Sequence, residues 1–173
     1  YVATRLKALG GNVEIIEPDV ASVYRMHDTP EKIGQMVKAT FLGKGQRSIL
    51  LIAHMDTVYL KGMLAKQPFR VDGDRAYGLG ISDDKSGVAA IIHALTALKR
   101  SGFDGYGRIT VLINGDEEIS SPGSRALLTA LGSEHDVVFS CESTSVASDR
   151  LSLATSGIAA VTLTVKGRAS HAG

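Results

Sequence analysis

The sequence predicts an α/β fold in which a mixed, mainly parallel sheet is flanked by helices. Apolar runs rich in β-branched residues, at 48–53 and 109–113, have the length and composition of buried strands. Between them, residues 88–98 carry apolar side chains at helical spacing. The chain holds 19 glycines but only 4 prolines, which is typical of tight turns between strands and helices.

The first half of the chain is predicted to form a helix, three strands and a hairpin. The helix and strands are expected at residues 1–9, 13–16, 36–42 and 48–53. Gly10 and Gly11 end the helix, because glycine adopts the left-handed conformation that closes a helix. A loop at 59–68 follows, and then a hairpin at 69–77 that turns at Asp72-Gly73-Asp74.

The second half is predicted to alternate helices and strands. The helix at 88–98 stops near Gly102, and two strands and a helix follow, at 109–113, 137–141 and 120–131. Ser121 is a candidate cap of the last helix, and Pro122 occupies a tolerated first-turn position.

The composition is that of one folded core with balanced charge. Of the 173 residues, 44% are hydrophobic and 21% charged, and the net charge is +1. This balance gives no electrostatic case for nucleic acid or for an anionic membrane, and no apolar run approaches the length of a membrane span. The single cysteine, Cys141, excludes an internal disulfide and a cysteine zinc cluster. The compartment stays open between cytoplasmic and periplasmic or secreted.

Metal-ligand residue types follow the predicted core strands. Asp116, Glu117 and Glu118 come directly after one strand and are expected to stand over the crevice where open α/β sheets bind ligands. Taken alone, this run is more typical of a solvated acidic loop. A second strand ends in His54 and Asp56, which share a face on an extended chain. Taken alone, a histidine in this position is more often structural.

The third strand is followed by Glu142, and the coincidence of three such strands favours a metal site. The expected set at this end of the sheet is His54, Asp56, Asp83, Glu117, Glu118 and Glu142. One imidazole with several carboxylates suits a hard to borderline divalent ion, with zinc foremost and cobalt or manganese as alternatives.

The glycine-rich turn at 78–87 also invites a phosphate-binding interpretation, which we reject. The glycine required just before Lys85 is missing, and Asp83 and Asp84 would repel a phosphate. Carboxylates at a helix start are often caps, so we expect one of these aspartates to cap the helix and the other to face the crevice.

The motifs at 48–87, 109–125 and 140–173 resemble the dizinc metallopeptidases that include folate-cleaving glutamate carboxypeptidase, aminoacylase and succinyl-diaminopimelate desuccinylase. The glutamate carboxypeptidase branch is the most similar. The resemblance implies a zinc exopeptidase fold and two zinc ions in a complete site. It makes His54, Asp83, Glu118 and Glu142 metal ligands, with Asp83 bridging both ions. It makes Asp56 the residue that orients His54.

The resemblance also makes Glu117 the general base. Ser86 and Gly115 depart from the family pattern without touching a ligand. A larger departure concerns a downstream histidine that binds the second metal in relatives, because no residue after Glu142 fits it.

The resemblance further implies a smaller α+β lid and dimerisation domain, inserted after a strand like 151–155. We therefore expect residues 1–155 to belong to the catalytic domain and 156–173 to begin the lid. His171 matches a histidine that reaches across a homodimer to the substrate carbonyl. The chain is expected to be a piece lacking an N-terminal segment and the C-terminal half, and to be inactive alone.

The implied activity is hydrolysis of a C-terminal glutamate or similar amide in folates, small peptides or N-acyl amino acids. The runner-up is an N-acyl amino acid deacylase or desuccinylase, because the choice of substrate depends on the lid. The alternative from another class is a noncatalytic metal-binding fragment.

Overall fold

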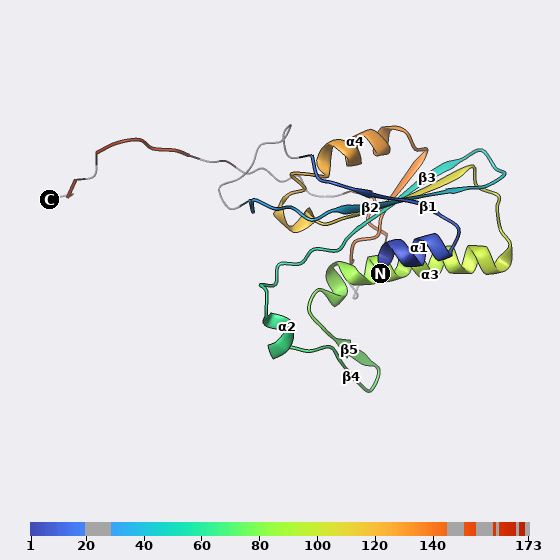
Figure 1. The fold of residues 1–173 in the computed structure, drawn as a ribbon, viewed down its shortest axis with the longest axis horizontal. Helices are drawn as coiled ribbons and strands as arrows, with labels where there is room; N and C mark the ends of the chain where they lie inside the picture. Colours follow the sequence, from blue (N-terminus) through green and yellow to red (C-terminus); the bar gives the residue numbers. More distant parts are fainter. Residues whose placement is uncertain (20–28, 145–150, 155–160, 162, 169, 172–173) are drawn as a thin grey trace. The chain divides into compact units, whose positions relative to one another are not determined.

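The computed structural model describes residues 1–19, 29–144, 151–154, 161, 163–168 and 170–171 (Figure 1). The chain divides into two units, residues 1–143 and 144–173. The expected domain boundary at residue 155 stays a prediction. Within the described residues, no helix is long and apolar enough to cross a membrane.

The first unit is built on a five-stranded sheet in the order β1-β2-β6-β3-β7 (Figure 1). The strands are β1 (Asn12–Ile16), β2 (Met36–Leu42), β3 (Ser48–His54), β6 (Arg108–Asn114) and β7 (Val137–Ser140). β2 is antiparallel to both β1 and β6, whereas β3 is parallel to β6 and β7. All strands except β2 therefore run in one direction, which confirms the predicted mixed, mainly parallel sheet.

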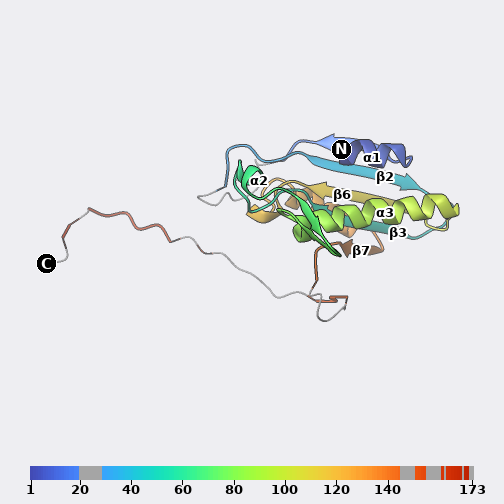
Figure 2. The same ribbon diagram turned by 90° about the horizontal axis from the view of Figure 1, so that it is seen from below.

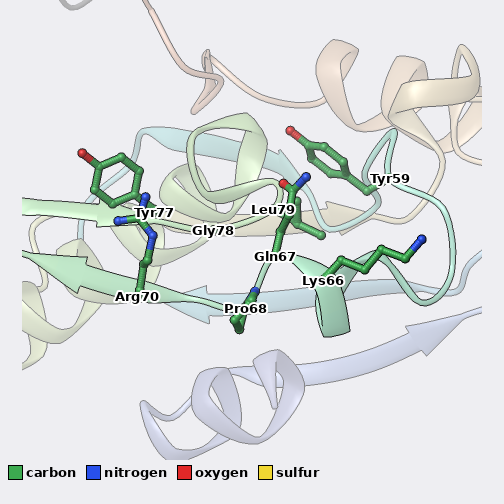
Figure 3. A pocket seen from close by; sticks show the side chains of 8 residues that line it. All are labelled: Tyr59, Lys66, Gln67, Pro68, Arg70, Tyr77, Gly78 and Leu79. Atoms are coloured by element: carbon green, nitrogen blue, oxygen red, sulfur yellow. The ribbon is translucent and has the colours of Figure 1, made fainter.

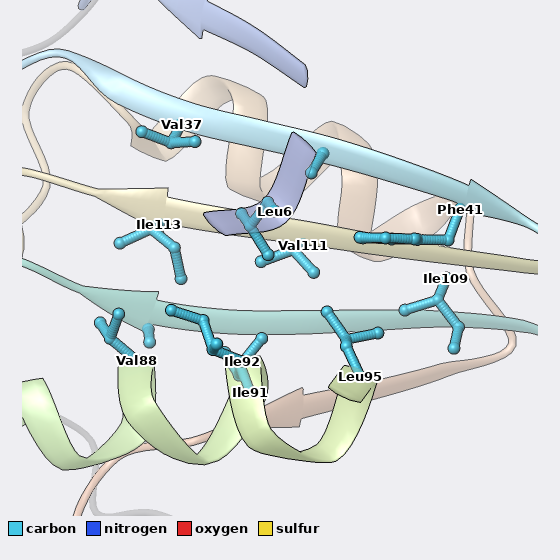
Figure 4. Packing of buried hydrophobic residues seen from close by; sticks show 12 residues of the cluster. Leu6, Val37, Phe41, Val88, Ile91, Ile92, Leu95, Ile109, Val111 and Ile113 are labelled. Carbon is cyan, nitrogen blue, oxygen red and sulfur yellow. The ribbon is translucent and has the colours of Figure 1, made fainter. Parts of the chain in front are cut away.

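Helices cover both faces of this sheet, α1 (Val2–Ala8) and α3 (Ser86–Ser101) on one face and α4 (Arg125–Ser133) on the other (Figures 1 and 2). The side chains of β6 alternate between two cores. Val111 packs with Leu6 of α1 and Ile91 of α3, as Figure 4 shows, and Leu112 packs with Leu131 of α4. Burial on both faces explains the continuous apolar run of β6.

The excursion between β3 and α3 contains the predicted hairpin and one unpredicted helix. The hairpin pairs β4 (Arg70–Asp72) with β5 (Arg75–Tyr77), as expected. The short helix α2 (Met63–Lys66) interrupts the segment that we expected to be a loop. Farther along the chain, residues 151–154 form no strand, and residue 155 lies outside the described residues.

The helix after β6 begins later than predicted. We expected it to start near Ser121, but α4 begins at Arg125. The reason is that Ser120 and Ser121 adopt left-handed backbone angles, with φ of 69° and 53°, which a right-handed helix cannot include. Residues 122–124 form a turn that leads into α4.

Candidate metal centre

The carboxyl ends of three parallel strands place the candidate ligands at one edge of the sheet. His54, the last residue of β3, lies opposite Asn114, the last residue of β6. On the other side of β3, the backbone N–H of Cys141 donates to the carbonyl of Ile52 at 2.8 Å, which fixes the chain just before Glu142.

The His54 side chain is the centre of the cluster. It is almost fully buried, with 1% of its surface exposed. Its Nε2 atom lies 2.9 Å from Asp83 Oδ1, 3.3 Å from Glu142 Oε2 and 3.9 Å from Glu117 Oε2. These carboxylates come from the turn before α3, from the residues after β7 and from the turn after β6, so folding alone gathers them around one imidazole nitrogen.

Asp56 lies on the opposite side of the imidazole. His54 Nδ1 is 3.2 Å from its hydrogen-bond partner, the Asp56 backbone carbonyl oxygen, and 3.3 Å from Oδ1 of the Asp56 carboxylate, so both groups help to fix the ring. The same carboxylate accepts hydrogen bonds from the backbone N–H groups of Glu117 at 3.2 Å and Glu118 at 2.9 Å. Asp56 therefore connects the end of β3 with the 3₁₀ turn Glu117–Ile119.

Asp83 and Asp84, joined by a cis peptide bond, divide their roles as expected. Asp84 is fully buried and accepts hydrogen bonds from the backbone N–H of Gly87 in the first turn of α3 and of His54, each at 3.2 Å. Asp83 is exposed and contacts the imidazole. Since Asp84 occupies the Gly87 amide, that amide is not available to a phosphate.

Asp116 does not stand over the crevice as we expected. Its side chain is 1% exposed and points below the turn, where it accepts hydrogen bonds from the Gly123 N–H, the Ser124 N–H and hydroxyl, and the Asn114 amide. These bonds satisfy a buried carboxylate and fix the start of α4. Asp116 thus holds the chain in place directly before Glu117 and Glu118.

The electrostatics of the site follow from its crowding with carboxylates. Burial lowers the pKa of His54, but the negative charges of Asp56, Glu142 and Glu117 outweigh burial, so the pKa is raised overall. Burial, with neighbouring negative charge, raises the pKa values of Glu118 and Glu142. In the described part of the chain, no lysine or arginine forms an ion pair with these carboxylates. A divalent cation would relieve this repulsion.

The donor set fits such a cation. Two groups of side chains have ligand atoms within 4.8 Å of one another, His54 with Asp83 and Glu118, and His54 with Asp84 and Glu142. The first contains three expected ligands. The second contains Asp84, which we had not expected as a ligand and whose two oxygens already accept backbone hydrogen bonds. The resemblance pointed to Asp83 alone, and only the fold shows that the Asp84 carboxylate lies close to His54 and Glu142.

His171 belongs to the second unit, so its predicted role at the substrate is not tested by the geometry of the first. The ligand roles likewise stay predictions. The first unit gathers an imidazole and several carboxylates beyond the ends of its parallel strands. This is the architecture of a metal-dependent hydrolase domain.

Comparison with known proteins gives the family. Residues 50–166 match the family model described as Peptidase family M20/M25/M40. Carboxypeptidase G2 from Pseudomonas sp. (strain RS-16) is 53% identical over 141 residues, which are 82% of this chain and 34% of that protein. Succinyl-diaminopimelate desuccinylase from Parvibaculum lavamentivorans is 34% identical over 140 residues, 75% of this chain and 35% of that protein.

A solved structure agrees in fold. The M20 family metallo-carboxypeptidase Sso-CP2 from Sulfolobus solfataricus superimposes with a TM-score of 0.63 at 18% identity, covering 81% of this chain and 30% of that one. The chain belongs to Peptidase family M20/M25/M40, a family of metallopeptidases. It spans about a third of the length of the curated relatives that it matches.

Proposed function

We propose that the complete protein is a metal-dependent carboxypeptidase that releases a C-terminal glutamate or similar amino acid from folates, small peptides or N-acyl amino acids. The observation that carries this proposal is the placement of Asp83, Glu142 and Glu117 around Nε2 of His54. The 53% identity to carboxypeptidase G2 supports the choice of reaction.

The proposed ligands are His54, Asp83, Glu118 and Glu142, and the proposed metal is zinc, with cobalt or manganese as substitutes. When bound, the metal would acidify water and polarise the amide carbonyl. A complete site would hold two such ions and take a further ligand from outside these residues. His54 would bind through Nε2, because Asp56 engages Nδ1.

Glu117 is the proposed general base. It would take the proton of the attacking water and deliver it to the leaving nitrogen. Its carboxylate faces the cluster, 3.9 Å from His54 Nε2, while its backbone N–H is held by Asp56. His171 of a partner subunit is proposed to polarise the substrate carbonyl in a homodimer.

A deacylase or desuccinylase is the second candidate, supported by the 34% identity to succinyl-diaminopimelate desuccinylase. Both candidates use the same metal and base and differ in the bound substrate. A noncatalytic metal-binding role is the third candidate. The Glu117→Gln variant separates it from the two catalytic candidates.

The test is the Glu117→Gln variant of the complete protein, with Glu134→Gln, an exposed glutamate at the end of α4, as the matched control. Glu117→Gln should keep its zinc content but release glutamate from N-acyl glutamates roughly a hundred- to ten-thousandfold more slowly. Glu134→Gln should behave as wild type. Near-normal turnover by Glu117→Gln would show that the base lies elsewhere.

A further inference from the structure

A pocket with a volume of about 440 Å³ opens in the excursion between β3 and α3. This excursion leaves the sheet at the end of β3, forms α2 and the β4–β5 hairpin, and ends at the turn before α3 (Figure 1). Its two ends touch, because a side chain built on Gly80 would collide with Thr57. Tyr59 and Leu79, which line the pocket, flank this contact. Tyr59 lies three residues after Asp56, and Leu79 lies four residues before Asp83, so short chain segments connect the pocket to the metal centre at both ends.

Two tyrosines and an arginine give the pocket planar side chains. Figure 3 shows Tyr77 and Arg70 at one end and Tyr59 and Lys66 at the other. The guanidinium carbon of Arg70 lies 3.8 Å from the centroid of the Tyr77 ring, so the two planar groups stack. Tyr59 and Tyr77 are 41% and 37% exposed, which leaves ring surface open to a ligand. Surfaces of this kind favour another planar ring.

The charge of the pocket is opposite to that of the metal centre. Lys66 and Arg70 line it, and no carboxylate does so. Within residues 1–19 and 29–144, no ion pair joins a carboxylate to either side chain. The ammonium, the guanidinium and the Gln67 amide offer hydrogen-bond donors. Such donors suit a ligand with carbonyl or carboxylate oxygens and do not suit a metal ion.

We propose that this hairpin pocket binds the acyl side of the substrate when the acyl group is a planar aromatic ring bearing oxygen acceptors. The proposal rests on the proposed function, because it assumes that the adjoining metal centre cleaves the amide of an N-acyl amino acid. The ring stacks beside Tyr77 and Arg70, and its oxygens accept hydrogen bonds from Lys66 and Gln67. An acetyl group has no ring to stack there, so the pocket selects aromatic over small aliphatic acyl groups.

The kinetic test compares two substrates with the same leaving group, N-(para-carboxybenzoyl)glutamate and N-acetylglutamate, in the complete zinc-loaded protein. Arg70→Ala and Tyr77→Leu should lower kcat/KM for the aromatic substrate by about tenfold, as expected for the loss of stacking with a cation. Their kcat/KM for N-acetylglutamate and their zinc content should stay within about twofold of wild type, because the lost contact is one that only the aromatic substrate makes.

The matched control is Arg75→Ala, which removes an exposed arginine of the same hairpin that does not line the pocket. It should leave kcat/KM unchanged for both substrates. An equal loss on both substrates in Arg70→Ala, or an equal loss of aromatic selectivity in Arg75→Ala, would overturn the proposal.

A binding measurement tests the pocket independently of turnover. Terephthalamate, which carries the same carboxybenzoyl group, is titrated into the metal-free complete protein and followed by ligand-observed NMR. Saturable binding that Arg70→Ala weakens and Arg75→Ala does not supports the pocket, even in a protein that hydrolyses neither glutamate conjugate and so fails the proposed function. Absence of saturable binding to the wild-type protein overturns the pocket whatever the activity.

Discussion

The carboxylate of Asp56 accepts a hydrogen bond from the backbone N–H of Glu118 at 2.9 Å, while its other oxygen lies 3.3 Å from Nδ1 of His54. Nδ1 also lies 3.2 Å from its hydrogen-bond partner, the backbone carbonyl oxygen of Asp56. The backbone and side chain of one residue thus fix the imidazole at the end of β3, and its carboxylate also fixes the turn that carries two acids after β6. The spacing between the proposed ligands His54 and Glu118 depends on this carboxylate.

Replacing Asp56 with alanine should therefore weaken metal binding and loosen the turn together. Loss of a carboxylate behind a ligating histidine typically costs about 10- to 100-fold in metal affinity. The N–H groups of Glu117 and Glu118 also lose their acceptor, so their amide hydrogens should exchange faster. Zinc competition with a chromophoric chelator and amide hydrogen exchange measure the two effects.

Asp74→Ala, at the exposed tip of the β4–β5 hairpin, is the control and should change neither quantity. Asp56→Asn keeps one carbonyl oxygen and should recover part of the exchange protection. If Asp56→Ala lowers zinc affinity but leaves exchange at Glu117 and Glu118 unchanged, Asp56 acts on the histidine alone.

The sequence was a sufficient guide to the parts of the fold set by apolar periodicity. The boundaries of β2 agree with the predicted 36–42, and β3 extends the predicted 48–53 by His54 alone. The carboxyl ends of parallel strands lie at one edge of a sheet, and this rule alone predicts that His54, Glu117 and Glu142 lie together. Such strands can be predicted from the sequence because a strand buried on both faces must be apolar along its whole length.

The inward-facing acids were not predictable by the same means. Asp116 and Glu117 are adjacent acids, yet the first is buried and the second exposed. The difference arises from hydrogen bonds to Gly123 and Ser124, seven and eight residues later, which come near Asp116 only once the intervening turn has formed. The late start of α4 has another cause, the left-handed backbone angles of Ser120 and Ser121, which the local sequence does not reveal either.

The carboxylate of Asp136 joins the starts of β3 and β7, whereas the metal centre lies at the other ends of these strands. This contact should be sensitive to acid. The carboxylate accepts hydrogen bonds from the Ser48 N–H at 2.7 Å, the Ser48 hydroxyl at 2.9 Å and Arg47 at 3.1 Å. These lower its pKa to about 2. Because the folded pKa lies below the unfolded value of about 3.9, the contact stabilises the fold above that value and is lost as pH falls toward 2.

Asp136→Asn should accordingly lower the free energy of unfolding at neutral pH, with a difference from wild type that shrinks between about pH 4 and pH 2. Urea titrations across this range measure the difference, and NMR of the carboxyl carbon gives the pKa directly. Ser48→Ala, which removes one donor, should move that pKa back toward its usual value. A pKa of Asp136 that Ser48→Ala leaves unchanged would contradict the assigned cause.

Gly87 joins the metal centre to α3 through close packing. It lies in the first turn of α3, and a Cβ atom at this position would fall within 3.0 Å of both the Cys141 carbonyl oxygen and the Asp84 carboxylate. Cys141 precedes Glu142, and Asp84 follows Asp83. A methyl group here would therefore displace the backbone on both sides of the proposed ligands.

Gly87→Ala should destabilise the fold and weaken zinc binding, although alanine is the better helix former. Alanine gains about 0.5–1 kcal/mol over glycine within a helix, whereas overpacking costs typically about 1–3 kcal/mol, so the net effect on stability is negative. Gly132→Ala is the matched control, because Gly132 lies in α4 with no atom within 4 Å of the position that the added methyl group would take. That variant should be more stable than wild type and bind zinc normally. Thermal unfolding and zinc titration of both variants give the comparison, and a Gly87→Ala protein that gains stability as Gly132→Ala does would show that the end of β7 does not press on α3.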